Sequence, residues 1–411
     1  MNGCGCDLGH LMPVDDAIAH LLEQVPPPPL AQMIPLEQAM GRVLAADILS
    51  PVNLPAWDNS AMDGYALRAS DLPEEGGYLL VGGRIAAGDP PGPTLRAQHA
   101  VQIFTGAPLP EGADTVVPQE LCRVEGDGVW FPPVSLGDHV RKEGEEFRRG
   151  ALLLKTGKRL RAQELGLLAG AGVARVEVYR PLQVGLLSSG NELREPGELL
   201  APGQIYNSNR YLLAALLRGW GVEVYDYGVM ADDLQTSRQT LSMVAARCDL
   251  LLSSGGVSVG EEDHLKKAIQ ELGKVNFWRL AIQPGKPLAY GEVLGKPWIG
   301  MPGNPSAALI TAMVVVRPFL LRAQGVGEVL PVPLAVPAGF DWPKRNKRRQ
   351  YLRARLTPDA EGRLSVELHP QQSSAMLTAA CWAEGLAVIE REALVHKHDE
   401  VMFLPFASLT Q

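Results

Sequence analysis

Strand-like and helix-like segments alternate along the middle of the chain, from about residue 181 to residue 324. Short apolar runs suited to buried strands are each followed by a segment whose apolar residues recur with helical spacing. This alternation predicts a doubly wound parallel sheet, in which ligands bind beyond the carboxyl ends of the strands. The expected strands are 183–187, 222–227, 250–253 and 298–299, and the expected helices are 207–218, 234–246, 263–271 and 305–320.

Loop 253–263 gives the strongest local signal, because it leaves an apolar strand and leads into a helix. Its glycines allow close approach of the backbone to a ligand, and a helix N-terminus favours an anion. Asp263 can either cap the helix or hold a divalent cation. A tight turn with a helix cap is the alternative to a phosphate-type site. The residues expected to bind are Ser254, Gly255, Gly256, Ser258 and Gly260.

Loop 187–192 follows another strand of the same expected sheet, and a plain turn explains it as well as a ligand site does. Two such loops on one sheet stand side by side, which strengthens both interpretations. The residues of interest here are Ser189, Gly190 and Glu192.

Two proline-stiffened segments follow, around residues 283–287 and 300–308. In the second, Asn304 suits a helix N-cap and Pro305 the first helical turn, so a capped helix is an even alternative to a binding loop. In the first, Lys286 could bind an oxyanion, although a lone lysine is more often a solvated surface residue. Pro302 and Gly303 complete the candidate binding loop of the second segment, 300–308.

Segment 55–66 carries two acids five positions apart, Asp58 and Asp63, and has no amphipathic period. Such a segment suits a surface loop whose carboxylates face a cation or a donor-rich ligand. A turn-rich connector is the alternative. Thr105, in segment 104–108, adds a further polar loop residue.

The flanking regions have different textures. Glycine and proline punctuate short apolar runs in residues 51–139, which predicts a small β-rich domain. Residues 325–411 contain short strands without long helices and predict a small β-barrel or sandwich. Helices are expected at 13–24, 36–40 and 162–169, with a strand at 175–179. We expect segment 159–180 to pack on the first helix, so that residues 1–50 and 140–180 form one discontinuous domain.

Composition sets further limits. With 411 residues the chain exceeds one ordinary core, and its net charge of −8 argues against general nucleic-acid binding. A basic cluster at 344–355 could still bind a small anion. No segment predicts a membrane span or a secretory signal, so a cytoplasmic protein is expected. The five cysteines do not suggest a disulfide framework, and Cys4, Cys6 and His10 suit a reduced tail better than a metal site.

Several of these loops, in chain order, resemble those of the molybdopterin molybdenumtransferases, the MoeA family, which includes the gephyrin E domain. The resemblance runs from about residue 11 to the end. It implies a discontinuous helical domain, a β-rich domain, a molybdopterin-binding α/β domain and a C-terminal β-barrel, in a homodimer with its active site between subunits. It also implies insertion of molybdate into adenylylated molybdopterin with release of AMP and help from Mg²⁺. The matching segments are 58–66, 105–108, 255–260, 284–287 and 302–305.

The same resemblance assigns roles to individual residues. Pro302 and Pro305 would shape the loop for the nucleotide or pterin, and Lys286, Arg353 and Ser373 would receive molybdate. An upstream molybdopterin adenylyltransferase and downstream molybdoenzyme chaperones are the implied partners. Five residues depart from the family pattern: Glu146, Asn191, Arg279, Gln283 and Gln372. The implied active-site residues are Asp63, Thr105, Glu192, Asp232 and Asp263, of which Asp63, Glu192 and Asp263 would hold the metal.

Two other functions remain open. The α/β domain alone also resembles the enzymes that adenylylate molybdopterin, but that function leaves segment 58–66 and the last domain unexplained. A non-catalytic scaffold, as in the receptor-anchoring role of the gephyrin relative, is the second alternative.

Overall fold

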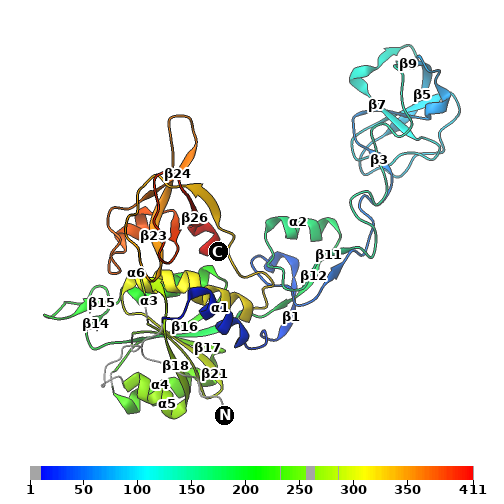
Figure 1. Ribbon diagram of the computed structural model, residues 1–411. Helices are drawn as coiled ribbons and strands as arrows, with labels where there is room; N and C mark the ends of the chain where they lie inside the picture. Colours follow the sequence, from blue (N-terminus) through cyan, green and yellow to red (C-terminus); the bar gives the residue numbers. More distant parts are fainter. Residues whose placement is uncertain (1–10, 232, 256–263, 286, 411) are drawn as a thin grey trace.

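The computed structural model describes residues 11–231, 233–255, 264–285 and 287–410. Figure 1 shows that the β-rich domain lies apart from the other domains. Two extended segments connect it to them. The other parts of the chain pack together around an α/β core, with the C-terminal sheet beside it. The fold is therefore a multidomain combination of α/β and β units.

The central sheet has the order β16-β13-β17-β21-β20-β18. The first four strands are mutually parallel, as predicted, but β20 runs antiparallel to both of its neighbours, β21 and β18. The expectation of a wholly parallel sheet was therefore wrong. A two-residue turn at Leu294 and Gly295, both with positive φ, joins β20 to β21. Two strands joined by so short a turn pair antiparallel, as a hairpin. The strands are β13 (Gln183–Ser189), β16 (Glu223–Met230), β17 (Leu250–Ser254), β18 (Gly273–Arg279), β20 (Pro287–Val293) and β21 (Lys296–Met301).

Helices cover both faces of this sheet, because successive strand residues point in opposite directions. Leu250 and Leu252 pack towards α1, α3, α6 and α7, whereas Leu251 packs towards α4 and α5. The apolar stretch Pro305–Ala323 is the one described segment long and apolar enough to cross a membrane, and most of it is buried in this core. The helices are α1 (Val14–Glu23), α3 (Ser208–Gly219), α4 (Leu234–Arg247), α5 (His264–Leu272), α6 (Pro305–Thr311), the π-helical η4 (Ala312–Val316) and α7 (Arg317–Ala323).

The first helix packs mainly on the α/β core, so the expectation that segment 159–180 packs on this helix was wrong. Val14, Ala17 and Leu21 are buried in the same cluster as Phe319. Segment 159–180 instead contacts residues 31–44, where β1 pairs with β12 and α2 covers the pair. The predicted helix at 36–40 is a single 3₁₀ turn. The elements are β1 (Ala31–Pro35), η1 (Leu36–Gln38), α2 (Ala162–Gly170) and β12 (Arg175–Tyr179).

The β-rich domain contains one sheet of order β7-β4-β6-β5-β9-β8. Two short antiparallel pairs, β2 with β11 and β3 with β10, lie along its connection to the remaining chain. The elements are β2 (Ile48–Leu49), β3 (Asn59–Ser60), β4 (Gly64–Leu67), η2 (Ala69–Asp71), β5 (Gly77–Ile85), β6 (His99–Ile103), β7 (Thr115–Pro118), η3 (Gln119–Leu121), β8 (Arg123–Glu125), β9 (Gly128–Phe131), β10 (Val140–Arg141) and β11 (Leu152–Leu154).

The C-terminal sheet curls on itself, because Ala338, just after β22, bridges to Val366 in β24. Strand β19 leaves the α/β domain and pairs with β23, so the two domains share a sheet edge next to residue 284. A separate β14–β15 pair projects from the α/β domain (Figure 1). The elements are β14 (Leu193–Arg194), β15 (Ile205–Tyr206), β19 (Ile282–Gln283), β22 (Leu334–Pro337), β23 (Arg349–Pro358), β24 (Leu364–Leu368), α8 (Thr378–Trp382), β25 (Gly385–Ile389), β26 (Glu400–Pro405) and α9 (Phe406–Leu409).

Candidate functional site

The loops that follow β13, β17 and β21 meet at one edge of the sheet. Ser188 lies opposite Ser254, and Ser254 lies opposite Met301, so the three parallel strands end at the same level. A cavity of about 540 Å³, here called the strand-tip cleft, opens at this edge. Its lining includes Ser189, Glu192, Asn207, Asn209, Ser254, Gly255, Pro287, Gly303, Asn304 and Pro305.

One glycine, Gly255, is required for the close packing of these loops, and a second, Gly190, lies under a side chain. A Cβ atom on Gly255, whose φ is +82°, would lie 2.3 Å from the carbonyl oxygen of Ser189. A Cβ on Gly190 would lie 2.5 Å from a carboxylate oxygen of Glu192. The first and second strand loops are therefore in backbone contact, and the Glu192 carboxylate folds back over Gly190 at the edge of the cleft.

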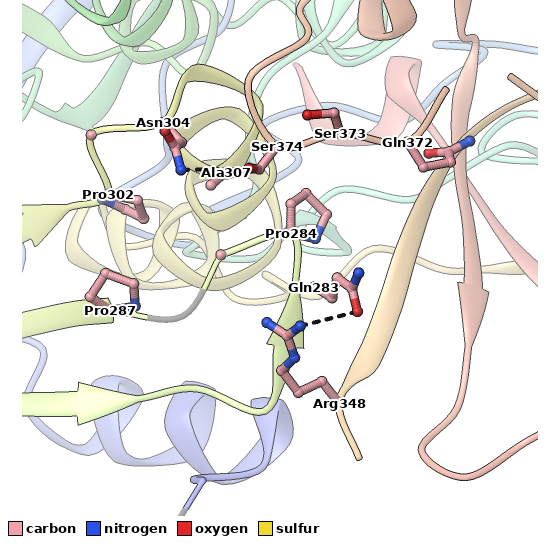
Figure 2. Close-up of a pocket in the computed structure, with 12 residues that line it drawn as sticks. Gln283, Pro284, Pro287, Pro302, Asn304, Ala307, Arg348, Gln372, Ser373 and Ser374 are labelled. Atoms are coloured by element: carbon pink, nitrogen blue, oxygen red, sulfur yellow. Dashed lines mark hydrogen bonds between the residues drawn. The ribbon is translucent and has the colours of Figure 1, made fainter. Parts of the chain in front are cut away.

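A second cavity, of about 350 Å³, lies between the α/β and C-terminal domains. Figure 2 shows loop residues of the α/β domain facing Arg348 and residues 372–374 across it. No carboxylate lines it, and Arg348 carries the only formal charge among its described lining residues. We call it the oxyanion pocket. Its lining is Gln283, Pro284, Gly285, Pro287, Pro302, Gly303, Asn304, Ala307, Arg348, Gln372, Ser373 and Ser374.

The two cavities adjoin. Pro287, Gly303 and Asn304 line both of them. Asn304 occupies the N-cap position of α6, as predicted, but makes no side-chain capping bond. Its Nδ2 lies 3.5 Å from Ser374 Oγ instead, as Figure 2 shows. The loop at 302–305 is thus a thin wall between the cleft and the oxyanion pocket.

Two of the departures from the family pattern have structural roles beside this pocket. Gln283 accepts hydrogen bonds from Asn346 and, at 3.3 Å, from Nη2 of Arg348, so a guanidinium stands next to the amide. The amide of Gln372 bonds the backbone of Arg353, with Oε1 accepting from the N–H at 2.9 Å and Nε2 donating to the carbonyl at 3.0 Å. Gln372 therefore fixes Ser373 against strand β23.

Arg353 lies directly behind the Ser373 wall and does not itself line the cavity. Its side chain has no solvent exposure, and Nη2 donates to the Ser373 carbonyl at 3.1 Å. Nε and Nη1 have no hydrogen-bond partner within the described part of the chain, and no described carboxylate pairs with Arg353. Burial lowers the pKa of Arg353 to about 10. An uncompensated positive charge at this depth favours an anion nearby.

Two other arginines of the basic cluster at 344–355 are paired with carboxylates elsewhere. Arg349 pairs with Asp15 and Glu390, and Arg355 pairs with Glu367. Within that cluster, Arg348 and Arg353 are the two described arginines beside the oxyanion pocket.

Asp63 and Thr105 form a polar pair in the β-rich domain. The backbone N–H and the hydroxyl of Thr105 both donate to Oδ1 of Asp63, each at 2.8 Å. These bonds, the backbone one foremost, lower the pKa of Asp63 and hold it ionised. Asp58 does not share this role, which corrects the interpretation of two carboxylates aimed at one ligand. It accepts from the side chain of Lys142 and ties the two connecting segments together.

The structure does not bring all predicted site residues together within one chain. The β-rich domain, with Asp63 and Thr105, lies far from the cleft and from Glu192 (Figure 1). Among the described residues there is no group of three histidine, cysteine or acidic side chains that could hold a metal ion. Asp232, Gly256, Ser258, Gly260, Asp263 and Lys286 lie outside the described residues, as do Cys4, Cys6 and His10.

Sequence reasoning missed Asn209 and Arg348 as individual site residues. Asn209 is 7% exposed and donates from Nδ2 to Ser254 Oγ at 2.8 Å and to the Gly303 carbonyl at 2.7 Å. Its position in the first turn of a predicted helix was visible, but its contacts with two distant loops were not. Arg348 was one arginine among several in a basic run.

Comparisons with known proteins agree with this architecture. Three family models match the chain: the MoeA N-terminal region at residues 12–172, a probable molybdopterin binding domain at 185–322 and the MoeA C-terminal region at 335–406. The molybdopterin molybdenumtransferase of Haemophilus influenzae is 37% identical over 385 residues, covering 93% of this chain and 95% of the relative. Molybdopterin molybdenumtransferase 2 of Mycobacterium tuberculosis is 38% identical and covers 78% and 82%.

Solved structures extend the likeness to the whole fold. A molybdopterin biosynthesis MoeA protein from Pyrococcus horikoshii superposes with a TM-score of 0.76 at 32% identity, over 97% of this chain and 99% of that one. A second MoeA structure from that organism gives a TM-score of 0.81 at 26% identity, over 96% and 100%. With all three regions matched in order and relatives similar over most of their length, the chain belongs to the MoeA family of molybdopterin molybdenumtransferases.

Proposed function

We propose that this protein acts in molybdenum cofactor biosynthesis as a molybdopterin molybdenumtransferase, inserting molybdate into adenylylated molybdopterin with release of AMP. One observation carries the proposal: two cavities of different chemistry share the wall at Gly303 and Asn304. A larger, phosphate-bearing substrate and a small oxyanion can therefore meet across a single loop.

The strand-tip cleft suits the phosphate-bearing pterin. Parallel strand ends, hydroxyl groups and a glycine turn are the usual setting for phosphate binding in such sheets. Ser189, Ser254 and the backbone at Gly190 and Gly255 would hold the phosphate groups. Gly256, Ser258 and Gly260 would extend this cradle, and Pro302 and Pro305 would shape the loop beside the nucleotide or pterin.

The oxyanion pocket suits molybdate, a dianion. Charged and hydroxyl donors bind such an anion well, and no described carboxylate opposes it there. Ser373 and Lys286 would receive it, helped by the buried positive charge of Arg353 behind the Ser373 wall. The role of these donors is to hold the oxyanion beside the substrate, so that positioning supplies most of the rate and no covalent intermediate with the protein is needed.

The described residues offer a magnesium ion one carboxylate at the cleft, that of Glu192. We assign Glu192 to the cation together with Asp263 and with Asp63 from the β-rich domain of a second subunit. When bound, Mg²⁺ would neutralise charge on the substrate phosphates. Thr105 would keep Asp63 ionised for this task, and Asp232 would complete the acidic set. The separation of the β-rich domain from the cleft in Figure 1 supports a homodimer in which these residues come from two chains.

In the cell, we place the enzyme in the cytoplasm, acting on a small-molecule substrate without nucleic acid or a membrane. A molybdopterin adenylyltransferase would act before it, and molybdoenzyme chaperones would receive its product.

The test is to mix the purified protein with adenylylated molybdopterin, Mg²⁺ and molybdate, and to measure AMP release and cofactor formation. We expect AMP release that depends on molybdate and falls steeply in Asp263→Ala. Unchanged turnover in that variant would remove Asp263 from the mechanism. Adenylylation of molybdopterin from MgATP without use of molybdate would favour the adenylyltransferase alternative, and the absence of both reactions would favour a scaffold.

A further inference from the structure

We propose that Asn209 is a positioning residue that couples the two cavities, so that a ligand in the strand-tip cleft strengthens oxyanion binding in the neighbouring pocket. This inference rests on the proposed function for the identity of the two ligands. Asn209 would act through the two loops that it contacts, at Ser254 and at Gly303.

Asn209 is placed to join two loops that are far apart in the sequence. Its single amide nitrogen donates to Ser254 Oγ at the end of β17 and to the carbonyl of Gly303 after β21. Both bonds are short, and the side chain is 7% exposed, so water competes poorly for them. The amide therefore fixes the spacing between the second and third loops at the base of the cleft.

The same contact sets the direction of the Ser254 hydroxyl. Because the oxygen of Ser254 accepts a hydrogen bond from Asn209, its own proton is free to point elsewhere. No described residue accepts that proton, and Ser254 lines the cleft. Asn209 thus prepares Ser254 to donate to an anionic group of a bound ligand. Oδ1 of Asn209 is also buried without a partner among the described residues, which leaves an acceptor at the base of the cleft.

From Gly303 the contacts continue into the oxyanion pocket. Gly303 and Asn304 form the shared wall, and Asn304 Nδ2 lies 3.5 Å from Ser374 Oγ. The backbone N–H of Ser306 donates to the Ser374 carbonyl at 3.0 Å. Ser374 lines the oxyanion pocket. A ligand that orders Ser254 and Asn209 would therefore also order the wall and the serine segment that contact the oxyanion, and the second ligand would bind a site already fixed.

Calorimetry can measure this coupling without turnover. Molybdate is titrated into the whole protein with and without saturating AMP, the nucleotide probe of the cleft. In the unaltered protein we expect AMP to tighten molybdate binding about fivefold or more, the usual lower range for coupled sites. In Asn209→Ala and in Asn209→Leu, which nearly keeps the side-chain size, loses the amide donors and adds no charge to the cleft, we expect the ratio to fall below about twofold while AMP and molybdate each still bind alone.

Tyr211→Phe is the matched control. It lies on the same helix, is exposed, and lines neither cavity, so the AMP effect should persist there. Thermal unfolding of each variant confirms that the fold is retained. The inference is overturned if AMP leaves molybdate affinity unchanged in the unaltered protein, or if both Asn209 variants retain the full effect. Failure of the proposed function has a different signature, since molybdate-dependent AMP release would then be absent even where coupling is measured.

Discussion

Replacing Arg353 with methionine should stabilise the ligand-free protein and at the same time weaken molybdate binding. The guanidinium is fully buried, and no described carboxylate pairs with it. Burial lowers the pKa of Arg353 to about 10, which corresponds to a penalty of about 3 kcal/mol for holding the charge in the fold. Methionine fills a similar space without a charge.

The net gain is smaller than that penalty, because the bond from Arg353 to the Ser373 carbonyl is lost. That bond is worth about 1 kcal/mol, which leaves about 2 kcal/mol of stabilisation. In the C-terminal domain, which contains Arg353, a stabilisation of this size raises the Tm by roughly 5 °C or more. Arg353 does not line the pocket, so the change removes only a positive charge behind the Ser373 wall and should weaken molybdate binding about tenfold at most.

Thermal unfolding with and without molybdate measures both effects, since a ligand that binds only the folded protein raises its Tm. We expect Arg353→Met to melt above the unaltered protein without ligand and to gain little from molybdate. Arg355→Met is the control: that side chain is on the same strand, partly exposed, and paired with Glu367, so neither property should change much. A variant that melts below the unaltered protein, yet responds fully to molybdate, would refute the reasoning.

Other predictions follow from the same contacts. Arg348→Gln should lower molybdate affinity about tenfold, because it removes a charge from the pocket lining, and Gln283→Lys in that background should restore it in calorimetry. Asp63→Asn should abolish most AMP release but leave molybdate affinity within twofold, because we assign Asp63 to the cation at the other subunit's cleft and not to the oxyanion pocket; unchanged AMP release would contradict the two-subunit site. Thr105→Val removes a donor that lowers the pKa of Asp63, so the acidic limb of the pH–rate profile should move to higher pH, and an unmoved limb would exclude Asp63 as the titrating group. Hydrogen bonds from Arg161 lower the pKa of Glu164 to about 2, so the stabilisation that it gives is complete above about pH 4.5 and is lost as the pH falls towards 2; Glu164→Gln should lack this part of the acid sensitivity in unfolding titrations.

Local sequence determined most of the secondary structure. The amphipathic spacing placed α1, α3, α4 and the long stretch Pro305–Ala323 to within about three residues, because each buries one apolar face or is wholly buried. The sequence also predicted strands β13 and β17, because their residues are mostly buried and form continuous apolar runs. Strand β18 and the hairpin of β20 with β21 were not, since a Leu-Gly turn is a weak hairpin signal compared with Asn-Gly.

For the site, the sequence determined which loops are rich in glycine, hydroxyl and carboxylate groups, because those patterns are local. Only the tertiary structure decided which of these groups meet. It paired Asp58 with Lys142 and Asp63 with Thr105, and it brought Asn209 to Ser254. It also buried Arg353 and left Arg348 facing the cavity, although both belong to one basic run. Burial and long-range contacts depend on how the domains pack, and the order of residues along the chain does not encode that packing in any local pattern.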